Sequence, residues 1–471
     1  MFTASYGIVN PSQEFLTQWI NETYTDRGAT LSEEKLNFIW SIVVGSITLG
    51  ALAGSLLVRT LAEGFGRRNG LILNGVFNVA GAVCQFVAKP TSSPEILIIG
   101  RFVLGANLGV ASGIVPMYLM ELTPAKYRGA AGTMHAVALS FADWFCLFIG
   151  LPEVLGGKDY WPYAFALPGV PALALVLILP FCPESPKYLL NSRGNRDAAF
   201  RAIDVLVCDE SSTDLYKDLV RNCGEDKRKR GTFRELFSRP DLRMPLYVSL
   251  FVMFAQQFTG CTAIFAYSTD MFIEAAIEPQ IARYATLAIG IAYFLCACMA
   301  PLLIDRLAAC LLSLIGLALF TGLQQYAEIG WARYGTIGSL ITYMCFYGVG
   351  SPIPWMITGE LFSQQFRSTA VTVSVFSVFA IACVVSTSYL PFKELVGITF
   401  SYTPFIVVTA VCVVVMYFIL PETKNRDIDD MSGEVWTLEQ STTGFQHEEL
   451  RNETESPVNS ITSKELSTDK F

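Results

Sequence analysis

A few polar side chains lie inside long apolar stretches of this chain, where a polar group without a partner is unfavourable. Asp143 is the only acidic residue well inside any of these stretches. At the centre of a bilayer a carboxylate costs roughly 2.5–3.5 kcal/mol on insertion scales, so it needs a water-filled cavity, a partner or a proton. Gln256, Gln257 and Trp355 are polar or amphipathic groups in the same setting. Buried amides of this kind also form hydrogen bonds between neighbouring helices.

Charged residues near the ends of the apolar stretches follow a pattern that occurs twice. In each copy an arginine comes seven residues after the glutamate of a Glu-Leu pair, and a Pro-Glu-(Ser/Thr) sequence comes further on. The residues of the two copies are Glu121, Arg128 and Glu184, and then Glu360, Arg367 and Glu422. The offset between the copies is 239 residues for the first feature and 238 for the second. Two related halves around a central site are a common construction of alternating-access membrane proteins.

The elements that must position these residues are predicted to be helices that cross a membrane. Hydrophobic residues make up 52% of the 471 positions and charged residues only 16%, whereas about 25% is usual in a soluble protein. Eleven apolar segments have about the 20 residues that a helix needs to cross a bilayer. They are 38–58, 70–88, 96–120, 129–151, 161–182, 244–268, 284–304, 307–326, 335–357, 369–390 and 402–420.

Lysine and arginine predict the orientation of these segments. Of the 33 basic residues, 25 lie in one alternate set of connections and the C-terminal tail, and seven lie in the other set. Because basic residues favour the cytosolic side, segment 183–243 and the C-terminus are predicted to be cytosolic. With eleven spans the N-terminus is then outside, where Asn21 of the sequon Asn21-Glu22-Thr23 is a glycosylation candidate. We expect a multi-pass protein of the plasma membrane.

The residue types argue against several classes of function. There are only two histidines, and the twelve cysteines show no paired metal-ligand spacing, so we expect no metal site and no cofactor. The segments outside the membrane contain no nucleophile–base set and no phosphate-binding loop, so we expect no enzyme. The net charge of −8 comes mostly from the tail and loops, and nothing indicates nucleic acid. The expected partners are the lipid bilayer and a small polar solute, and the sequence predicts no oligomeric state.

Nine ordered motifs carry a resemblance to a known family. They are Gly64-Phe65-Gly66-Arg67-Arg68, Gly100-Arg101-Phe102, Pro116-Met117-Tyr118-Leu119 with Glu121, Tyr127-Arg128-Gly129-Ala130, Pro183-Glu184-Ser185-Pro186-Lys187, Gln256-Gln257-Phe258-Thr259-Gly260, Pro352-Ile353-Pro354-Trp355, Glu360-Leu361-Phe362-Ser363 and Pro421-Glu422-Thr423-Lys424. On these motifs the chain resembles the sugar porters of the major facilitator superfamily, and most closely the animal facilitative glucose transporters. The resemblance implies an all-α membrane protein of two six-helix pseudo-repeats that transports a hexose or related polyol by alternating access.

The family has twelve spans and this chain shows eleven, because only residues 6–11 resemble the outer end of the family's first helix. We therefore expect either that roughly 20 further apolar residues are encoded upstream of Met1 or that this is a truncated isoform, and we expect poor transport by a chain that lacks the first helix. The predicted segments are a remnant of the first helix with an extracellular loop at 1–37, an N-terminal transmembrane bundle at 38–182, a cytosolic helical linker at 183–243, a C-terminal transmembrane bundle at 244–426 and a disordered cytosolic tail at 427–471.

By resemblance, charged residues at the cytosolic face form a network that closes the inner gate and separates when the gate opens. They are Arg67, Arg68, Glu121, Arg128 and Glu184 in the first half, and Glu360, Arg367 and Glu422 in the second. The alternative interpretation is that they are solvated loop charges. The chain departs from the family where Ala308-Ala309-Cys310 replaces an arginine pair and Gly64 replaces an arginine.

By resemblance, Gln256, Gln257 and Trp355 bind the solute, the amides through its hydroxyls and the indole through its ring. Other positions differ from the family. Ala136 replaces a glutamine, Thr262 and Tyr293 replace asparagines, Tyr347 replaces a glutamate, Phe379 replaces a tryptophan, and Met253-Phe254-Ala255 replaces Gln-Leu-Ser. Asp143 follows Ala136 by seven residues, close to two helical turns. We expect it to supply a polar contact in place of the missing glutamine, to carry a proton, or to bond to a neighbouring helix.

Three functions are consistent with these residues. The first is facilitative transport of a hexose or polyol. The second is proton-coupled sugar symport, with Asp143 in place of the proton acceptor that the family has on its first helix. The third is a non-transporting membrane sensor or regulatory relative. The lost gate arginines and the altered site residues favour the third function, whereas the retained Gln256, Gln257 and Trp355 oppose it. Which sugar is bound is not predicted.

Overall fold

The computed structural model of the chain describes residues 8, 13–123, 128–206, 231–274, 277–299, 307–327, 331–351, 354, 355, 358, 361, 362 and 364–419. Met1–Lys424 form one compact unit, to which all that follows refers. The predicted tail at 427–471 lies outside the described residues. Every regular element within the described ranges is a helix.

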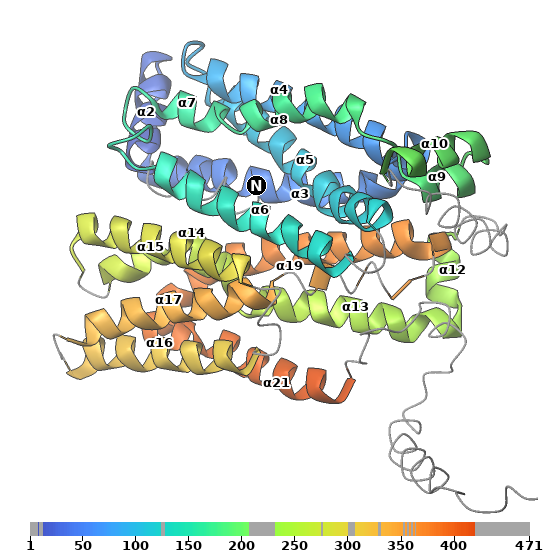
Figure 1. Cartoon of the computed structure of the whole chain (residues 1–471). Coiled ribbons are helices and arrows are strands. Elements are labelled where there is room, and N and C mark those ends of the chain that lie inside the picture. The colour runs from blue at the N-terminus through green and yellow to red at the C-terminus, as the bar shows by residue number, and fades with distance from the viewer. Residues whose placement is uncertain are drawn as a thin grey trace, which may run out of the picture. The chain divides into compact units, whose positions relative to one another are not determined.

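The helices of each half follow one another along the chain and are shown in Figure 1. In the first half they are α2 (Gln13–Asp26), α3 (Glu33–Gly64), α4 (Arg67–Ala88), α5 (Pro94–Leu122), α6 (Arg128–Ile149), α7 (Trp161–Ala166), α8 (Gly169–Ile178), the 3-10 helix η2 (Leu179–Phe181), α9 (Pro186–Asn191) and α10 (Arg196–Leu206). From residue 231 onward they are α12 (Phe233–Ser238), α13 (Pro240–Phe258), α14 (Cys261–Glu274), α15 (Pro279–Cys298), α16 (Leu307–Ala327), α17 (Ala332–Gly350), α19 (Gln364–Val396), α20 (Ile398–Ser401) and α21 (Thr403–Ile419).

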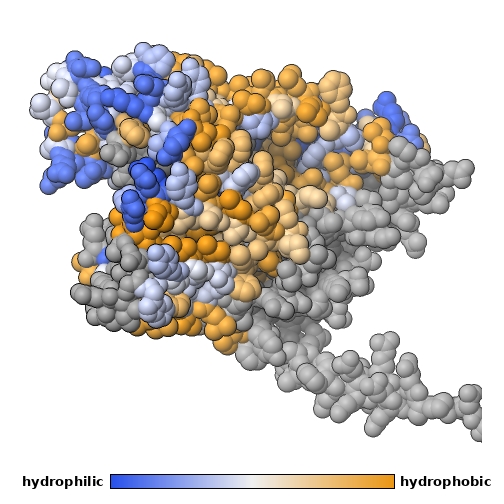
Figure 2. Space-filling view, turned by 60° about the vertical axis from the view of Figure 1, so that its left-hand side comes forward, coloured by the Kyte–Doolittle hydropathy of each residue, from blue (hydrophilic) through white to orange (hydrophobic). Residues whose placement is uncertain are grey.

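The outer surface of these helices is apolar, as a lipid environment requires. Seven helical segments of the described residues are long and apolar enough to cross a membrane, and three shorter apolar helices accompany them. Large side chains such as Phe77, Leu177 and Val414 are more than half exposed. Figure 2 shows apolar residues across the middle of the visible face and hydrophilic residues gathered toward one end. This distribution confirms the predicted class of all-α membrane protein.

All eleven predicted segments overlap helices, and the span predicted at 244–268 is made of two helices rather than one. The chain forms α13 and then α14, with a break at Thr259 and Gly260. Gly260 has φ +88°, a conformation that costs glycine little and ends an α-helix. The backbone oxygen of Thr259, which the break leaves without a helical donor, accepts a hydrogen bond from Tyr343 Oη at 2.9 Å. The apolar pattern is continuous across the break, so hydropathy alone missed it.

Helices α3 and α5 pack backbone against backbone. Gly50 and Gly54 of α3 lie against the main chain of α5, and Gly105 and Gly109 of α5 lie against the main chain of α3. A Cβ atom at any of these four positions would collide with a carbonyl oxygen. Small residues allow membrane helices to approach this closely. Helices α3 and α5 therefore form a closely packed pair within the first half.

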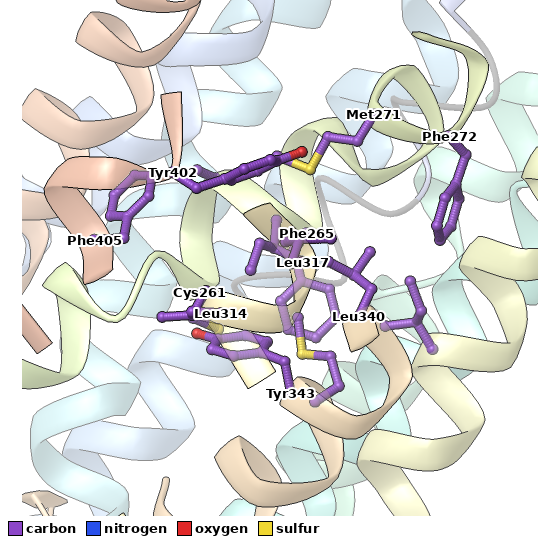
Figure 3. Close-up of a cluster of buried hydrophobic side chains, with 14 of the residues drawn as sticks. Cys261, Phe265, Met271, Phe272, Leu314, Leu317, Leu340, Tyr343, Tyr402 and Phe405 are labelled. Atoms are coloured by element: carbon purple, nitrogen blue, oxygen red, sulfur yellow. The ribbon is translucent and has the colours of Figure 1, made fainter. Parts of the chain in front are cut away.

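The two halves meet along a seam formed by two groups of helices. Helix α19 of the second half packs on α3 and α5, and α15 packs on α6. Behind the seam, the second half has its own core, in which Phe265, Leu317, Tyr343 and Phe405 come from four different helices (Figure 3). Each half is thus packed internally, and the seam is a separate contact between them.

Candidate functional site

A small cavity lies at the seam between the halves. Met117 of α5, Met253 of α13 and Val375 of α19 line it, together with Trp355 and Thr358. Its volume is about 10 Å³, which is room for about one water molecule. A ring-sized ligand can enter this place only if the halves move apart.

Two neighbouring glutamines lie in the last turn of α13, just before the break at Gly260. Gln256 Nε2 donates hydrogen bonds to the backbone oxygen of Ser351 at 3.3 Å and to Tyr347 Oη at 3.5 Å. Gln257 Oε1 accepts a hydrogen bond from Thr262 Oγ1 at 2.8 Å. The two amides therefore face different partners, one on α17 and one on α14.

Trp355 is partly buried and packs on a cluster formed by both halves. That cluster includes Met117 and Tyr118 of α5 and Val375 and Phe379 of α19. Phe379, which the sequence marked as a departure from the family, thus lies in the same cluster as Trp355. The structure brings three of the four predicted binding residues, Gln256, Gln257 and Trp355, to one side of the seam.

Asp143 lies apart from the small cavity, on α6 where it faces α15. Its side chain is 3% exposed, and α6 packs on α15 of the other half. On α15, Tyr293 Oη lies 3.5 Å from Ser351 Oγ.

A buried ion pair joins α4 and α5 at the end of the compact unit that carries α9 and α10 (the α9 end). Arg67 Nε lies 3.0 Å from Glu121 Oε2, and Arg67 Nη2 donates to Glu121 Oε1 at 3.1 Å. The pair is thus held by one hydrogen bond from Nη2 and by the close approach of Nε to the second carboxylate oxygen. Ser185 Oγ donates a further hydrogen bond to Glu121, and the Arg67 guanidinium lies over the ring of Tyr188.

Glu184 caps the amino end of α4. Its carboxylate accepts hydrogen bonds from the backbone N–H groups of Arg67 and Arg68, at 3.0 and 3.1 Å. The first turn of a helix has free N–H groups and a partial positive charge, so a carboxylate is favourable there. Gly66, with φ +99°, leaves the space that the carboxylate occupies. Arg68 adds a hydrogen bond from Nη1 to the backbone oxygen of Cys182 at 3.1 Å.

The contacts of Arg67, Arg68, Glu121 and Glu184 described above join them to other residues of the first half. Contacts across the seam at the α9 end come from other residues. Ser368 Oγ of α19 donates to Glu63 of α3. The backbone oxygen of Gly231 accepts hydrogen bonds from Arg59 Nη2 of α3 at 3.0 Å and from Thr369 Oγ1 of α19 at 3.2 Å.

The remaining predicted residues have varied positions. Glu360 and Glu422 lie outside the described residues, as does the side chain of Arg128 at the start of α6. Arg367 is buried on α19, where its Nη2 donates to the backbone oxygen of Phe362 at 3.4 Å. Asn21 is exposed on α2, and its glycosylation stays a prediction.

Sequence reasoning did not identify Arg59, Glu63 and Ser368. Arg59 and Glu63 form an ion pair at 3.8 Å just after a predicted span. Opposite charges four residues apart lie on one face of a helix, so the sequence could have indicated this pair. The sequence does not indicate the role of Ser368, because its partner Glu63 is 305 positions away.

This arrangement defines a class of protein. Two helical halves with apolar outer faces meet at a seam, and a broken helix places polar groups there, as in membrane transporters that alternate access between two sides. A profile of the family described as "Sugar (and other) transporter" matches residues 1–435, and the chain belongs to this family. It is a multi-pass membrane protein, and its family is one of transporters rather than enzymes.

Individual relatives agree with this assignment. The chain is 31% identical to the chicken (Gallus gallus) solute carrier family 2, facilitated glucose transporter member 1, over 92% of this chain and 90% of the relative. It is 30% identical to human (Homo sapiens) member 3, over 92% and 88%. Among solved structures, the proton:xylose symporter XylE bound to 6-bromo-6-deoxy-D-glucose superposes with a TM-score of 0.76 at 20% identity, covering 91% of this chain and 96% of XylE. The fold is therefore that of the major facilitator superfamily, as predicted.

Proposed function

We propose that the chain transports a hexose or related polyol across the plasma membrane by facilitated diffusion. The observation that carries the proposal is the position of Gln256 and Gln257 in the last turn of α13, just before the break at Gly260. Adjacent amides offer donors and acceptors that match sugar hydroxyls, and Trp355 supplies an apolar surface for the ring. The names of the relatives, glucose transporters and a xylose symporter, support the same class of solute.

In this proposal the α9 end and the C-terminus face the cytosol. The excess of lysine and arginine in the connections on that side supports this orientation. Asn21 then lies outside the cell, exposed for glycosylation on α2.

Transport requires the seam to open on one side at a time. At the α9 end, opening separates Glu63 from Ser368 and breaks the contacts that Arg59 and Thr369 make with Gly231. The interactions of Arg67, Glu121 and Glu184 then hold α4, α5 and α9 together while the first half moves relative to the second. In this proposal, Arg67, Glu121 and Glu184 of the predicted charge network stay together within the first half, and the contacts that open between α3 and α19 come from other residues.

The test is uptake of a panel of radiolabelled hexoses and polyols by transporter-null cells that express the protein from its complete coding sequence. We expect saturable uptake of at least one sugar, and weaker uptake in Gln257→Leu at equal surface expression. If the wild-type protein reaches the surface and takes up none of the panel, the protein is not a transporter of this class, and a sensor function is favoured instead.

A second candidate is coupling of sugar uptake to protons. The observation that favours it is a carboxylate, Asp143, 3% exposed within a span and facing the other half. Buried carboxylates in membrane transporters often carry protons. Accumulation of sugar above its external concentration when the outside is acidified would support coupling, and equilibration at every pH would exclude it.

A further inference from the structure

The wall of the seam cavity includes a buried hydroxyl that has no partner. Ser112 of α5 lines the cavity and is 9% exposed. Its hydroxyl makes no hydrogen bond within the described part of the chain, although such a group can both donate and accept. Because an unpaired buried polar group is unfavourable, the hydroxyl of Ser112 is available to a molecule in the cavity.

The backbone of Ser112 offers a second polar group. Pro116 lies inside α5, four residues later, and has no N–H. The carbonyl oxygen of Ser112 therefore lacks the donor that an α-helix supplies from the fourth following residue. Pro116 also lines the cavity, so the freed carbonyl lies next to it. Membrane helices tolerate proline where a neighbouring group or an ordered water molecule satisfies such a carbonyl.

The second half contributes a hydroxyl whose direction is fixed by its neighbours. Thr358, which lines the cavity, donates from Oγ1 to the backbone oxygen of Pro354 at 3.0 Å. Its single hydrogen is then in use, so Ser249 Oγ, at 2.9 Å, must donate to Thr358. Ser374 Oγ, 2.8 Å from Ser249 Oγ, must donate to Ser249 in turn. Thr358 Oγ1 keeps one lone pair, with which it can only accept.

These three groups match the hydrogen-bonding capacity of one water molecule. The cavity volume of about 10 Å³ is room for about one water, and a buried water typically makes about three hydrogen bonds. A water molecule in the cavity can donate one hydrogen to Thr358 Oγ1 and the other to the carbonyl oxygen of Ser112. Its own oxygen can accept from the hydroxyl of Ser112.

We propose that the seam cavity binds one water molecule, which joins Ser112 of the first half to Thr358 of the second. The water links α5 to the other half while the seam is closed, and the link is lost when the halves separate. Ser249 and Ser374 are positioning residues, because they keep the oxygen of Thr358 as an acceptor. The proposal concerns the closing of the seam and holds whichever solute the protein carries.

An experimental structure of the closed state that shows ordered water tests the site directly. We expect one water in the cavity, within about 3.2 Å of Thr358 Oγ1 and of the carbonyl oxygen of Ser112. If the surrounding side chains are well resolved and no water lies between these two atoms, the proposal is wrong.

A double-mutant cycle tests whether the water joins the halves. The measurement is the rate at which a thiol reagent labels Val371→Cys, at a cavity residue of α19, in a protein whose other reactive cysteines have been replaced. Ser112→Ala should raise the rate roughly 2- to 10-fold, the range for one lost hydrogen bond. In a Thr358→Val background the same substitution should add nothing, because the water no longer reaches across the seam.

Two further variants separate the water from packing. Thr358→Ser keeps the hydroxyl and should label at the rate of the parent protein. Thr372→Val is the matched control, because the hydroxyl of this buried threonine donates to the backbone oxygen of Ser368 within α19 at 2.8 Å. In that background Ser112→Ala should keep its full effect. Equal effects of Ser112→Ala in the Thr358→Val and Thr372→Val backgrounds would overturn the proposed link.

Discussion

The hydroxyl of Ser368 on α19 donates a hydrogen bond to the carboxylate of Glu63 on α3, which joins the two halves at the α9 end. Arg59, one turn before Glu63, reaches Gly231 at the start of the segment that leads into the second half. Thr369, next to Ser368, bonds to the same carbonyl of Gly231. Hydrogen bonds therefore link the two halves at the α9 end, beside the apolar cluster that α3, α5 and α19 share.

Removing the Ser368 hydroxyl should loosen this closure. In Ser368→Ala the Glu63 carboxylate loses a donor, at a cost of about 1–3 kcal/mol in the closed state. A cysteine introduced at Val371, which is 6% exposed beside the seam cavity, should then react faster with a thiol reagent. The measurement is the labelling rate of that cysteine against the same protein with Ser368 intact.

Ser377→Ala is the matched control for this experiment. Ser377 lies on the same helix, but its hydroxyl bonds to the backbone oxygen of Val373 within α19. An equal labelling rate in Ser368→Ala and Ser377→Ala would mean that the Glu63 contact does not hold the seam closed.

The proposed solute contacts predict a loss of affinity without a loss of folding. Gln257→Leu should weaken sugar binding by about 1–3 kcal/mol, the cost of leaving a hydroxyl unpaired. Trp355→Ala should act similarly through lost ring contact, and Trp355→Phe should retain most of the affinity because it keeps an aromatic surface. The measurement is the concentration of sugar that half-saturates uptake at equal surface expression. Wild-type affinity in both Gln257→Leu and Trp355→Ala would make these positions structural.

The sequence was a good guide to the helices and a poor guide to how they meet. Every segment predicted from apolar length overlaps a helix in the structure, because a helix that crosses the bilayer needs about 20 apolar residues. It did not locate the break at Gly260, since the residues on both sides are equally apolar. It also could not pair Glu63 with Ser368, because a hydrogen bond across 305 positions leaves no local pattern.

The resemblance to a family predicted which residues form the site, but it did not predict which side chains they contact. It marked Thr262, Tyr293 and Tyr347 as departures at solute-binding positions. In the structure Thr262 and Tyr347 are the residues that contact the two glutamines. These contacts could be recognised only from the geometry of α13, α14 and α17 together.

The ion pair of Arg67 and Glu121 should matter much more for stability than ion pairs at the surface. Both side chains are almost fully buried, so Glu121→Gln leaves an uncompensated guanidinium inside the protein, at a cost of about 3–5 kcal/mol. Asp159→Asn is the control, because Asp159 and Lys89 form an exposed pair at 3.5 Å and such pairs contribute about 0–1 kcal/mol. Thermal unfolding in detergent compares the two. Similar unfolding temperatures would show that Arg67 finds another acceptor.

The backbone contact of α3 and α5 predicts that larger side chains are excluded there. Gly109→Leu would drive a side chain into the main chain of α3, and overpacking of this kind costs about 1–3 kcal/mol or more. Gly45→Leu on α3 is the matched control, because no atom lies within 4 Å of a Cβ at that position. We expect Gly109→Leu to lower surface expression and the unfolding temperature, and Gly45→Leu to change neither. A stable Gly109→Leu protein would mean that α3 and α5 can separate freely.

Asp143→Asn separates the roles open to the buried carboxylate at the seam. The substitution keeps the shape and hydrogen-bonding capacity of the side chain but removes its charge and its proton. If Asp143 contacts the solute, the affinity for the sugar or the preference among sugars should change. If it carries a proton, uptake should lose its pH dependence and accumulation should stop, whereas affinity at low pH should remain.

Ser140→Ala is the control on the same helix, since its hydroxyl bonds only to the backbone oxygen of Val137 at 2.9 Å. Because Asp143 is buried on α6, which packs on α15 of the other half, a purely structural role would instead appear as a lower unfolding temperature. Unchanged affinity, selectivity and pH profile in Asp143→Asn, at normal surface expression, would exclude both solute contact and proton coupling.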